Sequence, residues 1–158
     1  MGTVIARQRN LPLVDLDEQI ETEAGKSIRE IFDEGGESMF RDLESEALQE
    51  VAAGPAAVVS LGGGAILRKE NRDLIRETGV CLWLDADAEV LAARIQNDES
   101  TSARRPSLTA EGLIDEIATL LDLRRPQYQE SAMARIDTSG KTIEQVAAEA
   151  IKFLTAQL

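Results

Sequence analysis

The sequence predicts an α/β fold of the three-layer αβα type, with a central parallel sheet between two layers of helices. Short apolar runs alternate along the chain with longer segments of helical period, which is the pattern of strands joined by helices. The runs Ala57–Leu61 and Val80–Leu84 are largely apolar, as expected of parallel strands buried on both faces. A chain of 158 residues with 43% hydrophobic residues holds one such domain, spanning residues 1–158.

Periodicity and end residues predict the N-terminal elements in turn. Gly25 ends one helix, and Ser27 with Glu30 forms a capping box that begins the next. The predicted elements are a helix tail at Thr3–Arg9, a strand at Leu11–Asp15, helices at Glu18–Ala24, Ser27–Phe32 and Glu37–Ala53, and a strand at Ala57–Leu61. The longest of these helices carries one apolar stripe, made of Phe40, Leu43, Ala47, Leu48 and Val51.

The C-terminal half continues the alternation. Its predicted elements are helices at Glu70–Thr78, Asp87–Gln96 and Glu111–Leu123, strands at Val80–Leu84 and Ala134–Asp137, and a last helix opened by Thr142 and Gln145. Arg124-Arg125-Pro126 is expected to close the helix that precedes the last strand. The polar stretch 97–110 has no periodicity, which predicts a loop, and we expect that loop to act as a lid.

Composition excludes several classes of function. A formal net charge of −12 argues against nucleic acid or an acidic membrane surface as a partner. No apolar run approaches the ~20 residues that cross a bilayer, so we expect a cytoplasmic protein. We also expect a monomer. The chain has no histidine and a single cysteine, Cys81. It therefore lacks the commonest general base, the usual zinc ligand and any internal disulfide.

Carboxylates and glycines gather where predicted strands end. Asp15 and Asp17 follow the first strand, at the edge where open α/β sheets bind their ligands. A solvated turn with a helix cap is the structural alternative for this pair. Gly62-Gly63-Gly64 follows another strand and permits close approach of the backbone to a ligand, although a plain tight turn remains open.

Arginines supply the anion-binding chemistry. Arg41 is placed to reach a cleft from the edge of its apolar stripe, or to pair on the surface with Glu37 or Glu44. Arg124 lies at a predicted helix end, where cations complement the helix dipole. A guanidinium grips a carboxylate through two hydrogen bonds, so Arg41 and Arg124 together are candidates for a carboxylate clamp.

The order and spacing of these motifs resemble the shikimate kinase family. The matching segments are Leu-Val-Asp-Leu-Asp from Leu13, Gly-x-Ser-Ile from Gly25, Phe-Arg at Phe40, the glycine triplet, Arg-Pro at Arg105 and Arg-x-Pro-x-Tyr from Arg124. The resemblance covers essentially the whole chain. It implies a P-loop kinase fold and transfer of the γ-phosphoryl of ATP to the 3-hydroxyl of shikimate, with Mg²⁺, in aromatic amino-acid biosynthesis.

The resemblance also assigns roles residue by residue. Asp17 would hold the shikimate ring hydroxyls and accept the proton, as a catalytic residue, while Glu44 would orient Arg41. The shikimate-binding set would be Asp17, Arg41, Gly62, Gly63, Gly64 and Arg124. Arg105 would be the lid arginine over the nucleotide phosphates and a second catalytic residue. Arg94 and Lys141 would lie near the adenine, and Asp15 would act on the metal through water.

One family feature is not found in the 158 residues, the phosphate loop Gly-x-x-x-x-Gly-Lys-Ser/Thr. Gly25-Lys26-Ser27 does not match it, because Ile20 stands where the first glycine belongs. We expect the family's first strand and this loop to lie upstream of Met1, and little turnover from the chain as printed. Three explanations stay open: a complete kinase read from an internal Met, a catalytically silent binding or sensor domain, and another P-loop kinase acting on a sugar acid.

Overall fold

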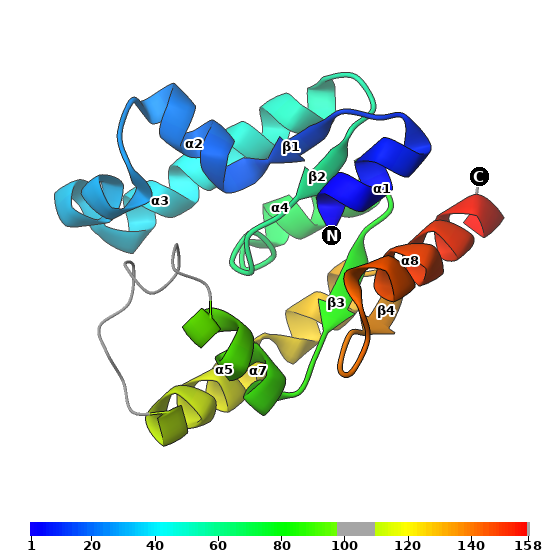
Figure 1. Ribbon diagram of the computed structural model, residues 1–158. Helices are drawn as coiled ribbons and strands as arrows, with labels where there is room; N and C mark the ends of the chain where they lie inside the picture. The colour runs from blue at the N-terminus through cyan, green and yellow to red at the C-terminus, as the bar shows by residue number, and fades with distance from the viewer. Residues whose placement is uncertain (98–109, 158) are drawn as a thin grey trace.

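The computed structural model describes residues 1–97 and 110–157 (Figure 1). The first part of the chain forms α1 (Gly2–Arg9), β1 (Leu13–Asp15), α2 (Leu16–Ala24), α3 (Ile28–Ala53), β2 (Val58–Ser60) and α4 (Lys69–Thr78). The second part forms β3 (Leu82–Asp85), α5 (Ala88–Asn97), α7 (Ala110–Ser131), β4 (Ala134–Asp137) and α8 (Ile143–Gln157). The predicted alternation of strands and helices is confirmed.

The strands are parallel, and they pair in two sets. β1 pairs with β2, with Asp15 opposite Ser60, and β3 pairs with β4, with Asp85 opposite Asp137. The prediction that the core strands are buried on both faces is wrong in detail. All of β2 is only half-buried, and Leu84 of β3 is 42% exposed. The physical reason is that β2 and β3 each have one hydrogen-bonded neighbour in the described chain, which leaves an edge open.

Helices cover both faces of the β3–β4 pair. Side chains alternate along a strand, so Leu82 and Ile136 face α8, where they pack with Val146. Trp83 faces the other way and stacks on Tyr128 of α7. This arrangement of helix, strands and helix is the predicted layered order (Figure 1).

A second core joins α2, α3 and α4 beneath the segment that follows β2. The fully buried side chains in this cluster include Leu16, Ile20, Ile31 and Ala47. The predicted apolar stripe of α3 is confirmed, since Phe40, Ala47 and Leu48 are buried and Leu43 and Val51 pack against them. This core fixes α2 and α3 relative to the glycine triplet.

Local capping explains where several helices begin and bend. Ser27 and Glu30 form the predicted capping box at the start of α3. Thr142 and Gln145 exchange equivalent hydrogen bonds, of 2.9 and 3.3 Å, at the start of α8. Gly36 has φ 67°, a left-handed conformation that glycine adopts freely, and divides α3 where the sequence predicts a break between two helices.

The predicted end of α7 is wrong. The helix continues through Pro126 to Ser131, so Arg124 and Arg125 lie inside it and not in its last turn. Proline removes one amide donor, but Tyr128 stacks on Trp83 and Ser131 is buried, and this packing stabilises the extra turns. The dipole explanation for these arginines therefore fails. Instead, Arg124 and Tyr128 lie one turn apart on one helix face.

Among the described helices, none is long and apolar enough to cross a membrane.

Candidate active site

The glycine triplet that follows β2 is approached by a different element at each residue. A Cβ atom at Gly62 would lie 3.3 Å from Asp17 Oδ1 on α2, and one at Gly64 would overlap the guanidinium of Arg41 on α3. At Gly63 a Cβ atom would lie 3.0 Å from the Tyr128 hydroxyl on α7. Any larger residue would displace these side chains. The glycines therefore give polar groups from three helices room to meet over one short backbone segment.

Asp15 and Asp17 have separate positions in this arrangement. Asp15 caps α2, and its Oδ1 accepts hydrogen bonds from the amides of Asp17 (3.1 Å) and Glu18 (3.4 Å). The predicted alternative, a helix cap, is thus confirmed for Asp15. The cap holds Asp17 in the first turn of α2, where its half-buried carboxylate meets Gly62.

Arg41 and Glu44 form a buried ion pair on α3. The Arg41 Nη1 to Glu44 Oε2 distance is 2.7 Å, and the two side chains are 15% and 2% exposed. Arg41 also contacts the exposed Glu37 at 3.4 Å, so both predicted surface partners are real. The pair is nevertheless not a surface feature. Glu44 is almost completely buried, and a Cβ at Gly62 would lie 3.7 Å from its Oε1.

Burial raises the pKa of Glu44. Hydrogen bonding and the charge of Arg41 lower this pKa, while the neighbouring Asp17 carboxylate adds to the rise. A raised pKa means that the folded state holds the proton more tightly than the unfolded state does. The cost of removing Glu44 from water therefore offsets part of its attraction to Arg41.

The raised pKa of Glu44 predicts how stability depends on pH. The free energy of unfolding is expected to fall as pH rises from the ordinary glutamate pKa of about 4.3 to the raised pKa of Glu44 in the folded state. In that window the folded state binds more protons than the unfolded state. Glu44→Gln should remove this part of the slope, as measured by urea unfolding from about pH 4 to about pH 8. Glu30→Gln is the control, because Ser27 lowers the pKa of Glu30 and its contribution has the opposite sign. An unchanged slope in Glu44→Gln would contradict the expectation.

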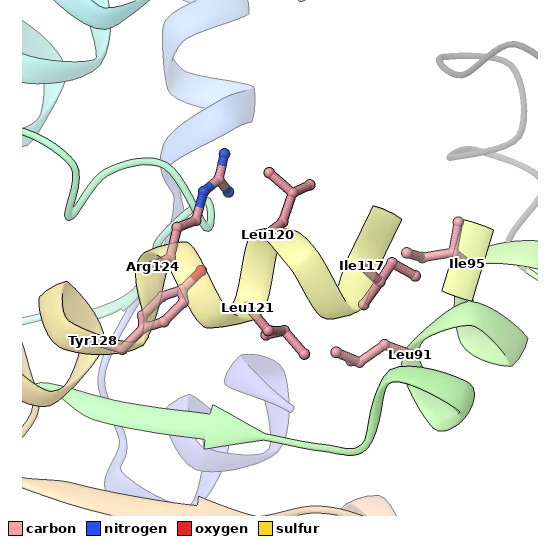
Figure 2. A pocket seen from close by; sticks show the side chains of 7 residues that line it. All are labelled: Leu91, Ile95, Ile117, Leu120, Leu121, Arg124 and Tyr128. Atoms are coloured by element: carbon pink, nitrogen blue, oxygen red, sulfur yellow. The ribbon is translucent and has the colours of Figure 1, made fainter. Parts of the chain in front are cut away.

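Arg124 and Tyr128 reach Gly63 from α7. The Tyr128 hydroxyl donates to the Gly63 carbonyl at 2.9 Å, and Arg124 Nη1 donates to the same oxygen at 3.4 Å. Figure 2 shows both polar groups at one end of a cavity of about 140 Å³. The remaining wall of this cavity, between α5 and α7, is apolar and consists of Leu91, Ile95, Ile117, Leu120 and Leu121.

The structure brings together the whole predicted shikimate-binding set, which is Asp17, Arg41, Gly62, Gly63, Gly64 and Arg124. Tyr128 also lies at this site, although no role was predicted for it from the sequence alone. Its signal was present in the Arg-x-Pro-x-Tyr spacing, which places it four residues after Arg124. That spacing becomes informative only when the helix is known to continue past Pro126.

The predicted nucleotide-binding residues lie elsewhere. Arg94 of α5 donates to the hydroxyl and the carbonyl of Thr138, both at 2.9 Å. The Lys141 amide bonds the same carbonyl at 3.3 Å, and its Nζ contacts Glu149 at 2.8 Å. Arg94 and Lys141 thus meet at the turn after β4. Arg105 and most of the predicted lid, 97–110, lie outside the described residues.

Comparison with known proteins gives one consistent family. A family model described as shikimate kinase matches residues 1–155. A shikimate kinase of Rhodopirellula baltica is 47% identical over 96% of this chain and 81% of its own length. One from Symbiobacterium thermophilum is 37% identical over 98% of this chain and 87% of its own length.

Solved structures agree with the sequence relatives. The crystal structure of a shikimate kinase from Bacteroides thetaiotaomicron matches with a TM-score of 0.89 at 31% identity, over 98% of this chain and 89% of that one. A shikimate kinase from Acinetobacter baumannii, solved in complex with shikimate, matches with a TM-score of 0.88 at 28% identity. That match covers 99% of this chain and 85% of the other.

Proposed function

The chain belongs to the shikimate kinase family, and from this membership we propose that the residues around Gly62–Gly64 bind shikimate for phosphorylation by ATP. The observation that carries the proposal is the convergence of polar side chains from α2, α3 and α7 on the three glycines. A polyhydroxylated acid needs cations for its carboxylate and acceptors for its hydroxyls. This site presents both within one short stretch of backbone.

Arg41 and Arg124 are the proposed partners of the substrate carboxylate. They come from different helices and contact adjacent glycines, since a Cβ at Gly63 would lie 3.7 Å from Arg124 Nη1 and one at Gly64 would overlap Arg41. Glu44 orients Arg41 by holding one of its amino groups at 2.7 Å. A planar guanidinium fixed in this way offers its remaining donors in a geometry that matches a carboxylate.

Asp17 is the proposed proton acceptor. Phosphoryl transfer requires positioning and charge neutralisation more than covalent chemistry, so one carboxylate suffices to hold the attacking hydroxyl and receive its proton. The substrate oxygen forms the new bond to the γ-phosphorus, and ADP leaves as the old bond breaks. The cap from Asp15 holds the first turn of α2, and with it the Asp17 backbone, in place.

For the nucleotide we propose Arg94 and Lys141 beside the adenine and Arg105 over the phosphates. Mg²⁺ bound with ATP neutralises phosphate charge, and Asp15 is its proposed ligand through water. The described residues fit this role, since Mg²⁺ keeps several waters and needs only one or two carboxylates beside the phosphates. They contain no group of three side chains that would form a protein cage. We further propose a single-domain, cytoplasmic monomer.

Arg124→Lys is expected to weaken shikimate binding by about 30-fold, because the charge remains but the bidentate geometry is lost. Isothermal titration calorimetry with shikimate measures the change. Arg125→Lys is the matched control, because Arg125 is the neighbouring arginine on α7 but is directed at Trp83. Its Cζ atom lies 5.8 Å from the centroid of the Trp83 ring. Its dissociation constant should change less than about twofold. Unchanged shikimate affinity in Arg124→Lys would refute the clamp.

A further inference from the structure

Tyr128 is the polar group at the site that the proposed function leaves without a role. Its ring is half-buried and stacks on Trp83, with centroids 5.4 Å apart and planes inclined by 13°. Its hydroxyl meets the Gly63 carbonyl at 2.9 Å, across 65 residues of sequence. The contact therefore joins the long helix α7 to the glycine segment after β2.

The ring has little freedom to move. Trp83 is 7% exposed and also has the Arg135 guanidinium 5.2 Å from its ring centroid. Arg135 in turn donates to the buried Asp85 at 2.7 Å. Tyr128 is thus held by a stack that rests on β3 and β4, and the position of its hydroxyl is set by the strands as well as by its own helix.

The Gly63 carbonyl is shared between two donors of unequal quality. At 2.9 Å the bond from Tyr128 has ordinary length, whereas the bond from Arg124 Nη1 at 3.4 Å is long. A carbonyl that already has a good donor competes weakly for a second one. The hydroxyl of Tyr128 thereby reduces the pull of Gly63 on the guanidinium of Arg124.

We propose that Tyr128 is a positioning residue for shikimate: its hydroxyl anchors the Gly63 carbonyl and so keeps the Arg124 guanidinium directed at the substrate carboxylate. The proposal rests on the proposed function, in which Arg124 binds that carboxylate. Without the hydroxyl, Arg124 becomes the remaining described donor to Gly63 and closes on it. The Arg124 guanidinium then has fewer hydrogen-bond donors free for the substrate carboxylate.

Tyr128→Phe tests the proposal because it removes only the hydroxyl and keeps the stack on Trp83. We expect the dissociation constant for shikimate to rise roughly five- to tenfold, by calorimetry. In turnover assays of the full-length protein, KM for shikimate should rise by a similar factor and kcat should stay within about twofold. Ser131→Ala is the matched control. It deletes a buried hydroxyl on the same helix, whose hydrogen-bond partner among the described residues is the Gln127 carbonyl.

A double-mutant cycle separates positioning from general loosening of the fold. If Tyr128 acts through Arg124, then Tyr128→Phe should change shikimate affinity by less than about twofold in an Arg124→Met background. An effect of equal size in both backgrounds would overturn the proposal, as would no effect in the unsubstituted background.

A crystal structure of Tyr128→Phe without shikimate gives a second, independent test. The distance from Arg124 Nη1 to the Gly63 oxygen should shorten from 3.4 Å to an ordinary bond of about 2.9 Å. An unchanged distance would overturn the proposal. If the unsubstituted protein does not bind shikimate, the proposed function fails, and the crystal structure still decides the role of Tyr128 toward Arg124.

Discussion

Asp17→Asn is expected to lower kcat for shikimate phosphorylation in the full-length protein by at least about a hundredfold. The amide keeps the shape of the side chain beside Gly62, where Asp17 Oδ1 lies 3.3 Å from a Cβ position. It cannot accept the proton of the attacking hydroxyl. Nucleotide affinity should stay nearly constant, because the proposed nucleotide residues meet elsewhere: Lys141 lies in the turn after β4, and Arg94 of α5 donates to Thr138 in that turn. A coupled assay for ADP release, with calorimetry for ATP and Mg²⁺, measures both quantities.

Two neighbouring substitutions are the controls for Asp17. Glu18→Gln removes a negative charge from the same turn of α2 on an exposed side chain, and should leave kcat within about twofold. Asp15→Asn keeps the helix cap, because asparagine caps as well as aspartate, and should alter the Mg²⁺ dependence instead. Near-normal turnover in Asp17→Asn would show that another group accepts the proton.

Arg41→Met is expected to lower the free energy of unfolding by about 3 to 5 kcal/mol, because it leaves Glu44 buried without its partner. The loss should be larger at neutral pH than in acid, where a protonated Glu44 carries no charge to compensate. Denaturant unfolding of the variant at two pH values measures this. Shikimate binding should be lost with it.

The rest of α3 provides the comparison. Arg29→Met removes an arginine whose side chain is 77% exposed and whose contact with Asp33 is 4.0 Å long, so its cost should stay below about 1 kcal/mol. Adding Glu44→Leu to Arg41→Met should restore part of the lost stability, because the unpaired charge is then removed. A loss in Arg41→Met no greater than in Arg29→Met would show that the buried pair does not hold α3 in place.

Features decided within one turn of chain were predictable from the sequence. Three examples depend on neighbours a few residues apart: the capping box of Ser27 and Glu30, the break at Gly36 and the start of α8 at Thr142. The apolar stripe of α3 was also predictable, because the helical spacing of its apolar residues predicts a buried face. Phe40 and Ala47 on that face are buried. Motif order then identified the glycines and arginines that converge on the site.

Features decided by distant contacts were not predictable in this way. Pro126 indicated a helix end, but the stack of Tyr128 on Trp83 carries α7 onward to Ser131. The exposure of Leu84 depends on which strands pair with β3, and an apolar run alone does not predict the pairing of strands. The role of Tyr128 depends on a hydrogen bond to Gly63, which no local pattern contains.

The stacked rings of Trp83 and Tyr128 give the protein a built-in optical reporter. Trp83 is the sole tryptophan of the chain, so tryptophan emission comes from this position alone. The indole is separated from the Gly63 carbonyl by the Tyr128 ring and its hydroxyl. An unfolding step or a substitution that separates Tyr128 from Trp83 changes the surroundings of the indole. The contact between α7 and β3 can therefore be followed in real time on unlabelled protein as the chain folds or unfolds, in a stopped-flow instrument or a plate reader.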